Sequence, residues 1–274
     1  MLMATWKIAP ALATGNSVIL KPSEKSPLTA LRLAELAIEA GIPAGVLNVL
    51  PGYGKECGEP MALHMDIDGL VFTGSTAVGR HLLTCAGRSN MKRAYMECGG
   101  KSPNLVFADA PDLKRAAEAA ASGIFYNQGE VCTAGSRLIV EDKIKDEFLA
   151  KVMAIGQKMM PGDPLDPKTQ MGAMVDETQT KRVMGYIDAG QKEGAKLAMG
   201  GKQVHIDNAG SFIEPTVFDN VDNKMKIAQE EIFGPVLSVI PVKDAEQALT
   251  VANDTIYGLA SAIFTSDINK AFKF

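Results

Sequence analysis

The sequence predicts an α/β fold, in which a Rossmann-type parallel sheet is followed by a second α/β domain. Short apolar runs of strand length alternate with helix-length segments along the whole chain. This pattern is typical of doubly wound sheets. Glycine or proline closes many of these runs. The 274 residues suffice for one large domain or two of medium size, and a hydrophobic share of 46% with 22% charged residues is typical of globular proteins.

The first part of the chain alternates strand and helix patterns. Residues 28–40 are rich in Ala, Leu and Glu, and Gly41 and Pro43 then end the predicted helix. A second helix pattern follows Thr76 and runs to Ala86. The apolar runs between these segments predict strands at residues 17–20, 46–50, 69–72 and 92–97.

The same alternation continues with longer segments after Gly99. We expect helices at residues 112–125, 143–158, 176–193 and 245–253. We expect strands at residues 104–107, 137–140, 236–242 and 261–264. Glycines follow a predicted strand at Cys98–Gly100, so we divide the chain into domains at residues 1–98 and 99–274.

Composition excludes several classes of protein. The net charge of −4 comes without a basic run, which argues against a nucleic-acid partner. No apolar stretch is long enough for a membrane span, and the N-terminus lacks the order of a secretory signal. The four cysteines form no C-x-x-C pair, which favours a reducing compartment and hence the cytoplasm. The three histidines are scattered, so we predict no metal site.

Two segments carry the candidate chemistry. Cys132 stands between Gly129 and Gly135, and Glu97 stands at a strand end just before Gly99 and Gly100. A thiol can attack an electrophilic carbon, and a carboxylate can activate the water that releases the product. The alternatives are a buried, inert cysteine, which we favour for Cys57, Cys85 and Cys98, and a surface acid that caps a turn.

Three further segments have features of a nucleotide site. Gly74-Ser75-Thr76-Ala77-Val78-Gly79 follows a strand and opens a helix, where backbone N–H groups can receive a pyrophosphate, although a simple tight turn would read the same. Lys21-Pro22-Ser23-Glu24 can reach a ribose or form a solvated turn. Glu230 to Pro235 places two acids and an aromatic residue before a rigid Gly-Pro bend, and the alternative is a simple polar loop. Gly100-Lys101-Ser102 is no P-loop, because that pattern needs glycine where Tyr95 stands.

Taken in order, five segments resemble the signatures of the aldehyde dehydrogenase superfamily over the whole chain. They are Lys21–Glu24, Phe72–Ser75, Glu97–Asn104, Asn127–Cys132 and Glu230–Pro235. The resemblance implies an aldehyde dehydrogenase-like fold with a partial NAD-binding domain at 1–98 and a partial catalytic domain at 99–274. It also implies the oxidation of an aldehyde to a carboxylic acid.

By that resemblance, Cys132 is the nucleophile, which forms a thiohemiacetal and, after hydride transfer to the nicotinamide, a thioester. Its backbone N–H holds the oxyanion, and Glu97 activates the water that hydrolyses the thioester. The implied cofactor-binding residues are Lys21 and Glu24 for the adenosine ribose, Gly74, Ser75 and Gly79 for the pyrophosphate turn, and Glu231 and Phe233 for the nicotinamide riboside.

The resemblance also suggests a cofactor and a substrate class. Glu24 favours NAD, because a carboxylate repels the 2′-phosphate of NADP, which remains the alternative. Residues 125–129 and the insertion at Pro111 are most similar to aminoaldehyde, betaine-aldehyde and γ-glutamyl-γ-aminobutyraldehyde dehydrogenases. The expected partner is a small aldehyde, with no nucleic acid and no membrane. A full-length form would be a homo-oligomer.

The chain also departs from the family pattern, which leaves other functions open. The family has a Trp-Asn-Phe motif whose Asn donates a second hydrogen bond to the oxyanion, and no residue here matches it. The family also continues beyond Phe274, so we expect a central fragment. One alternative is a catalytically impaired remnant that binds nucleotide or a partner. Another is a thiol esterase that uses Cys132 and Glu97 without a cofactor.

Overall fold

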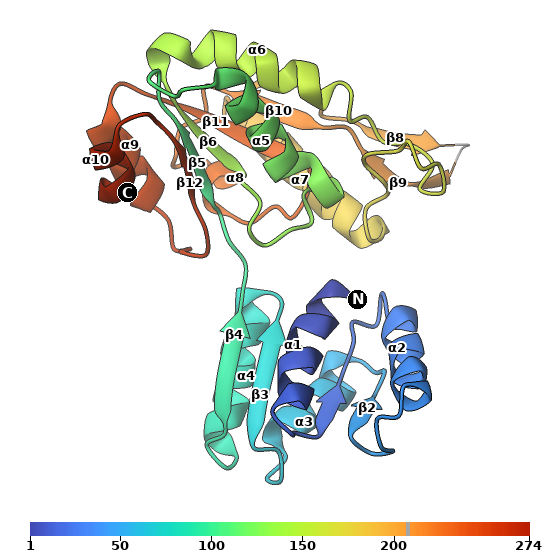
Figure 1. Ribbon diagram of the computed structural model, residues 1–274. Helices are drawn as coiled ribbons and strands as arrows, with labels where there is room; N and C mark the ends of the chain where they lie inside the picture. Colours follow the sequence, from blue (N-terminus) through green and yellow to red (C-terminus); the bar gives the residue numbers. More distant parts are fainter. Residues whose placement is uncertain (207–208) are drawn as a thin grey trace. The chain divides into compact units, whose positions relative to one another are not determined.

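The computed structural model describes residues 1–206 and 209–274 of the chain (Figure 1). It forms two compact units, Met1–Cys98 and Gly99–Phe274, each with its own hydrophobic clusters. The α/β fold predicted from the sequence is confirmed. None of the helices within the described ranges is both long and apolar enough to cross a lipid bilayer.

The first unit contains two short parallel sheets and their helices. Its elements are α1 Leu2–Ala13, β1 Val18–Leu20, α2 Leu28–Glu39, β2 Leu47–Val49, the π-helix η1 Gly54–Gly58, α3 Glu59–Leu63, β3 Gly69–Thr73, α4 Thr76–Arg88 and β4 Arg93–Glu97. Strand β1 pairs with β2, and β3 pairs with β4 so that Thr73 lies opposite Glu97. The last residues of β3 and β4 therefore lie at one edge of their sheet.

The second unit is built on a six-stranded sheet in the order β12-β5-β6-β11-β10-β7. The strands of the unit are β5 Pro103–Val106, β6 Arg137–Glu141, β7 Lys196–Met199, β8 Gln203–Ile206, β9 Ala209–Ile213, β10 Thr216–Asp219, β11 Val236–Val242 and β12 Ala262–Phe264. Its helices are α5 Leu113–Phe125, η2 Tyr126–Gly129, η3 Asp142–Ile144, α6 Lys145–Gly156, α7 Glu177–Lys192, α8 Lys226–Gln229, α9 Ala245–Asn253 and α10 Ile268–Lys273.

Alternate side chains of the central strands enter two separate hydrophobic clusters. Leu138 and Val140 of β6 pack with the alanine-rich face of α5 and with α6, whereas Ile139 packs with α7, α8 and α9. Successive side chains of a strand point to opposite faces, so both faces of this sheet are covered. Figure 1 shows α5 and α6 together over the six-stranded sheet.

The predicted strands and helices are observed to within a few residues, and the structure adds elements that the sequence patterns did not predict. Strand β7 runs antiparallel to β10 at the edge of an otherwise parallel sheet, and β8 and β9 form an antiparallel pair. An antiparallel edge strand on a parallel sheet is common in α/β folds. Helices α1 and α3 were also missed, because α1 contains an internal proline, Pro10, and α3 has only 5 residues.

Candidate active site

Cys132 lies in the connection between η2 and β6, in the second unit. Its side chain is partly buried. A Cβ atom added to Gly100 would lie 2.5 Å from the carbonyl oxygen of Cys132, so the two backbone segments are in close contact. Within the described part of the chain, the Cys132 N–H donates to no acceptor. That group is therefore available to donate to an oxygen of a ligand beside the thiol.

The turn before Cys132 has an unusual backbone that side chains hold in place. Asn127 and Gln128 have φ angles of 49° and 56°, in the left-handed region. The Asn127 side chain donates to the carbonyl of Glu130 at 3.1 Å. The Gln128 side-chain amide donates to Ala173 O at 2.9 Å and accepts from the backbone N–H of Gly172. Such strained residues persist only where their surroundings fix them, and they cluster at functional sites.

Glycine is required at position 129 in the same turn. Its φ of +70° is strained for other residues. A Cβ atom there would also overlap the carbonyl of Gly234. The turn before Cys132 thus packs directly against the Gly-Pro bend after Phe233.

Glu231 lies against the two glycines that begin the second unit. Its carboxylate accepts a hydrogen bond from the backbone N–H of Gly100 at 3.2 Å, and a Cβ atom on Gly99 would overlap that carboxylate. Burial raises the pKa of Glu231, and the Gly100 N–H and the charges of Arg182 and Lys101 oppose that effect. The structure therefore brings Glu231 and Cys132 to the same glycine-rich backbone, Gly99–Gly100.

Phe233 lies on a loop whose backbone carbonyls accept hydrogen bonds from side chains of α7. Phe233 has a φ of 58°, again in the left-handed region. The Gln179 side chain donates to the carbonyls of Ile232 and Phe233 at 3.1 and 2.7 Å, and Arg182 donates to the carbonyl of Glu231 at 3.0 Å. Sequence analysis missed Gln179 and Arg182, because about fifty residues separate them from the loop and no local motif marks them.

Lys101 is a further group that sequence analysis did not select. It is 1% exposed, and its Nζ has no hydrogen-bond partner among the described residues. Burial, assisted by the charge of Arg137, lowers the pKa of Lys101 to about 7. Lys101 also lines a cavity of about 380 Å³ together with Ser102 and Tyr257. A buried, unpaired amine beside a cavity is typical of functional sites. The rejected P-loop pattern contains Lys101 but does not predict that its side chain is buried.

Gly74, Ser75 and Gly79 lie together at the start of α4, in the first unit. Ser75 is the N-cap, and its hydroxyl accepts from the backbone N–H of Val78 at 3.3 Å. The other N–H groups at a helix start have no acceptor within the helix, which makes this end a site for anions. A Cβ atom on Gly79 would lie 2.7 Å from the sulfur of Cys98. Only glycine therefore lets α4 pack this closely on the end of β4.

Lys21 and Glu24 follow β1 in the first unit. The Lys21 ammonium donates to the carbonyls of Pro22 and Gly52 at 2.7 and 2.8 Å. It lies 3.8 Å from the Glu24 carboxylate, whose side chain is 45% exposed. The backbone contacts fix the ammonium in place, while the carboxylate stays accessible to a hydroxyl-bearing ligand.

Glu97 is the last residue of β4 and is exposed. Its carbonyl accepts from the backbone N–H of Gly74 at 3.1 Å, so the start of the α4 turn and the end of β4 are joined. Within the first unit, the structure thus brings Glu97 close to Gly74 and the turn after β3. Glu97 belongs to the first unit and Cys132 to the second.

Comparison with known proteins identifies relatives along the whole chain. The model of the aldehyde dehydrogenase family matches residues 1–274. The NADP/NAD-dependent aldehyde dehydrogenase PuuC of Escherichia coli (strain K12) is 52% identical over 273 residues, which are 100% of this chain and 54% of that protein. The chain spans about half the length of the curated relatives it matches.

Two solved structures have the same fold. An indole-3-acetaldehyde dehydrogenase in complex with NAD⁺ superimposes with a TM-score of 0.97 at 62% identity, and the match covers 99% of this chain and 55% of that one. A γ-glutamyl-γ-aminobutyraldehyde dehydrogenase from Burkholderia cenocepacia J2315 gives 0.96 at 58% identity, with the same coverage.

Proposed function

Because the chain belongs to the aldehyde dehydrogenase family, we propose that it takes part in the NAD-dependent oxidation of an aldehyde to a carboxylic acid. The observation that carries the proposal is the extent of the family match, which covers both units and with them both Glu97 and Cys132. The availability of the Cys132 backbone N–H supports it from the structure.

The residues of the first unit fit a dinucleotide. The first turn of α4, beside Ser75, offers N–H groups to a pyrophosphate, whereas the Gly74 N–H is already bound to the Glu97 carbonyl. The close packing at Gly79 leaves no room for a Cβ. The accessible Glu24 carboxylate can accept hydrogen bonds from ribose hydroxyls, beside the fixed Lys21 ammonium. In the second unit, Glu231 and Phe233 would hold the nicotinamide riboside. When bound, NAD supplies the acceptor for the aldehyde's hydride.

The thiol of Cys132 would act as the nucleophile. Its attack on the carbonyl carbon forms a carbon–sulfur bond and places negative charge on the former carbonyl oxygen. The free N–H of Cys132 donates to that oxygen, and one such donor contributes about 3–4 kcal/mol to the stability of the transition state.

Glu97 would act as the general base that releases the product. Its carboxylate takes a proton from water, and the resulting hydroxide attacks the thioester carbon and expels the Cys132 thiolate. An exposed position at the end of β4 suits this role, because a base needs access to water. Strand ends in α/β folds are where catalytic groups usually lie.

The substrate class that we propose is a small aldehyde with an amino or γ-glutamylamino group. Support comes from the similarity of residues 125–129 to aminoaldehyde enzymes and from the 58% identity to a γ-glutamyl-γ-aminobutyraldehyde dehydrogenase. An aromatic aldehyde is the alternative that the indole-3-acetaldehyde dehydrogenase suggests.

The first test is the formation of NADH by the purified chain with NAD and a panel of amino, γ-glutamylamino and aromatic aldehydes. We expect Cys132→Ser to lower turnover by a factor on the order of 10³ or more, because serine is not activated here as a nucleophile. Cys57→Ser is the matched control, since Cys57 lies far from Cys132 in sequence and in another unit.

Glu97→Gln separates the two halves of the reaction. We expect a first burst of NADH to remain and steady turnover to fall by about 10²- to 10⁴-fold, the usual contribution of a general base. NADH formation that survives Cys132→Ser would refute the proposal. Ester hydrolysis without NAD, in the absence of any NADH formation, would instead favour the thiol esterase.

A further inference from the structure

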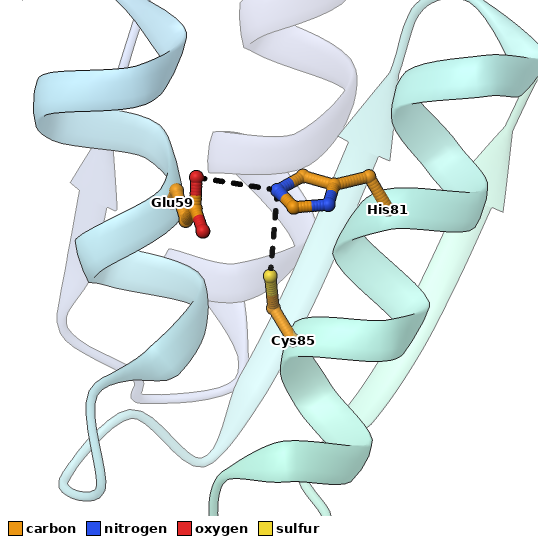
Figure 2. Close-up of side chains that lie close together, drawn as sticks. All are labelled: Glu59, His81 and Cys85. Atoms are coloured by element: carbon orange, nitrogen blue, oxygen red, sulfur yellow. Dashed lines mark hydrogen bonds and ion pairs between the residues drawn. The ribbon is translucent and has the colours of Figure 1, made fainter.

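A cluster of three different side chains lies in the first unit, apart from the residues assigned to the dinucleotide (Figure 2). The Nε2 atom of His81 lies 3.3 Å from a carboxylate oxygen of Glu59 and 3.7 Å from the sulfur of Cys85. One ligand atom from each of the three side chains lies within 4.8 Å of the other two. An imidazole nitrogen, a carboxylate oxygen and a sulfur thus lie close together.

Two helices bring these side chains together. His81 and Cys85 are four residues apart on α4, so they share one face of that helix. Glu59 is the first residue of α3, whose Ala62 packs with Leu82 and Cys85 in one apolar cluster. The positions of Glu59, His81 and Cys85 are therefore fixed by the packing of α3 against α4.

Lys92 adds a second connection between the same helices. Its buried ammonium donates to the carbonyl of Ala62 at 2.7 Å and to the hydroxyl of Ser89 at 2.6 Å. Ser89 is the residue at which α4 ends. The ends of α3 and α4 are thus held together, and the three ligand groups start from a fixed backbone.

The geometry suits a tetrahedral zinc ion. Zinc binds sulfur at about 2.3 Å and nitrogen or oxygen at about 2.0–2.2 Å, so its ligand atoms are separated by roughly 3.3–3.7 Å. The two distances from His81 Nε2 match these values, and the Glu59 oxygen lies within 4.8 Å of the Cys85 sulfur. A thiolate and a carboxylate carry two negative charges, which would balance the charge of Zn²⁺.

Without a metal, the Nε2–H of His81 can donate to the Glu59 carboxylate and, more weakly, to the Cys85 sulfur. With zinc bound, the nitrogen, the oxygen and the sulfur would each direct a lone pair at the metal instead.

We propose that Glu59, His81 and Cys85 bind a zinc ion, with water as the fourth ligand. The imidazole is 50% exposed and the Glu59 side chain 33%, so the ion can enter from solvent, whereas Cys85 is fully buried and closes the site from the other side. Three protein ligands plus water are typical of zinc sites with an open position. The ion would connect α3 to α4, the helix whose first turn we propose for the pyrophosphate.

No motif in the sequence marks this site, because its ligands do not follow the spacing of a known zinc pattern. Only one of its ligands is a histidine, and Glu59 lies more than twenty residues before it. The i, i+4 spacing of His81 and Cys85 on a helix is the one local signal. The prediction of no metal site followed from the scattered histidines, and a site with a single histidine does not depend on their spacing.

Cobalt tests the site, because Co²⁺ replaces zinc and its visible spectrum reports the ligands. The full chain carrying Cys132→Ser serves as the background, so that the proposed nucleophile cannot bind the metal. We expect tetrahedral cobalt bands with a thiolate charge-transfer band, and loss of both when zinc is added. Cys85→Ser should remove the charge-transfer band. His81→Gln and Glu59→Gln should each weaken binding at least about tenfold.

Cys57→Ser and His64→Gln are the matched controls. Both residues belong to the first unit, and neither belongs to the cluster. We expect both variants to bind cobalt as the background does. Circular dichroism checks folding, and if the buried Cys85→Ser variant is unfolded, the exposed His81→Gln variant decides.

Thermal unfolding gives an independent reading. Zinc binds only the folded site, so it should raise the midpoint temperature of unfolding of the Cys132→Ser background. The midpoint temperature of the same protein with His81→Gln should stay unchanged. The proposal is overturned if the charge-transfer band persists in folded Cys85→Ser. It is likewise overturned if His81→Gln binds cobalt unchanged, or if the background binds with a Kd above about 1 mM.

Discussion

At the scale of single residues, Lys101 is the group whose charge the fold opposes most clearly. It is almost fully buried, its Nζ has no partner among the described residues, and burial lowers its pKa from 10.5 to about 7. In the unfolded chain the amine keeps its ordinary pKa of 10.5. As the pH falls from 10.5 to 7, the unfolded chain therefore binds a proton that the folded chain does not, and the fold loses stability.

We therefore expect Lys101→Met to stabilise the chain at pH 7 by several kcal/mol, because each pKa unit corresponds to about 1.4 kcal/mol. The gain should shrink as the pH rises toward 10.5, where the lysine is neutral in both states. Urea unfolding of both proteins at several pH values measures it. Lys114→Met, at an exposed position of α5, is the control and should change little. A gain that does not depend on pH would show that packing, and not the charge, is responsible.

The residues proposed for catalysis illustrate what sequence can and cannot predict. Cys132 and Glu97 were selected from short segments, because glycines beside a thiol or a carboxylate are a local signal. The contact of Gly100 with both Cys132 and Glu231 could not be predicted, since it joins segments up to 131 residues apart. Lys101 was visible only as part of a rejected phosphate motif, because burial is a property of the fold.

At the scale of elements, α4 carries both a stability role and a binding role at one residue. Ser75 caps the helix by accepting from the Val78 N–H, and Ser75→Ala should destabilise the chain by about 1 kcal/mol. Ser75→Asp restores a capping acceptor but adds a negative charge where we propose the pyrophosphate. We therefore expect Ser75→Asp to keep wild-type stability in urea unfolding and to bind NAD at least about tenfold more weakly by calorimetry.

Asp112→Ala provides the comparison for that prediction. Asp112 caps α5 in the same manner, by accepting from the Arg115 N–H, but it lies in the second unit. The Asp112→Ala variant should lose about as much stability as Ser75→Ala, and its affinity for NAD should be unchanged. Equal NAD affinity in Ser75→Asp and the wild type would remove the helix start from the proposed binding site.

The elements predicted correctly share a physical feature. Helices α4, α5, α7 and α9 begin at a capping side chain, and Gly41 follows the C-cap of α2. The central strands are continuous apolar runs between turn residues. Periodicity and caps are local, so the sequence shows them. Strands β7 and β8 have only four residues each, and none of these residues is fully buried. Their pairing with β10 and β9 depends on contacts made after the chain turns back.

At the scale of the whole molecule, the two units have separate hydrophobic cores. The clusters of the first unit contain residues from Ala4 to Met96, and those of the second contain residues from Leu105 to Phe274. No cluster of described residues has members from both units. Cooperative unfolding follows shared packing, so each unit should respond to a change in its own core.

Leu82→Ala and Ile187→Ala test that separation. Each deletes a buried side chain, one from the cluster between α3 and α4 and the other from the cluster beneath α7, and such truncations cost about 2–5 kcal/mol. In native-state hydrogen exchange, we expect Leu82→Ala to speed exchange of amides within residues 1–98 and to leave the slowest amides of residues 99–274 unchanged. Ile187→Ala should do the reverse. If either variant speeds exchange equally in both units, the chain unfolds as one cooperative body, and stability is coupled between the proposed nucleotide-binding and catalytic parts.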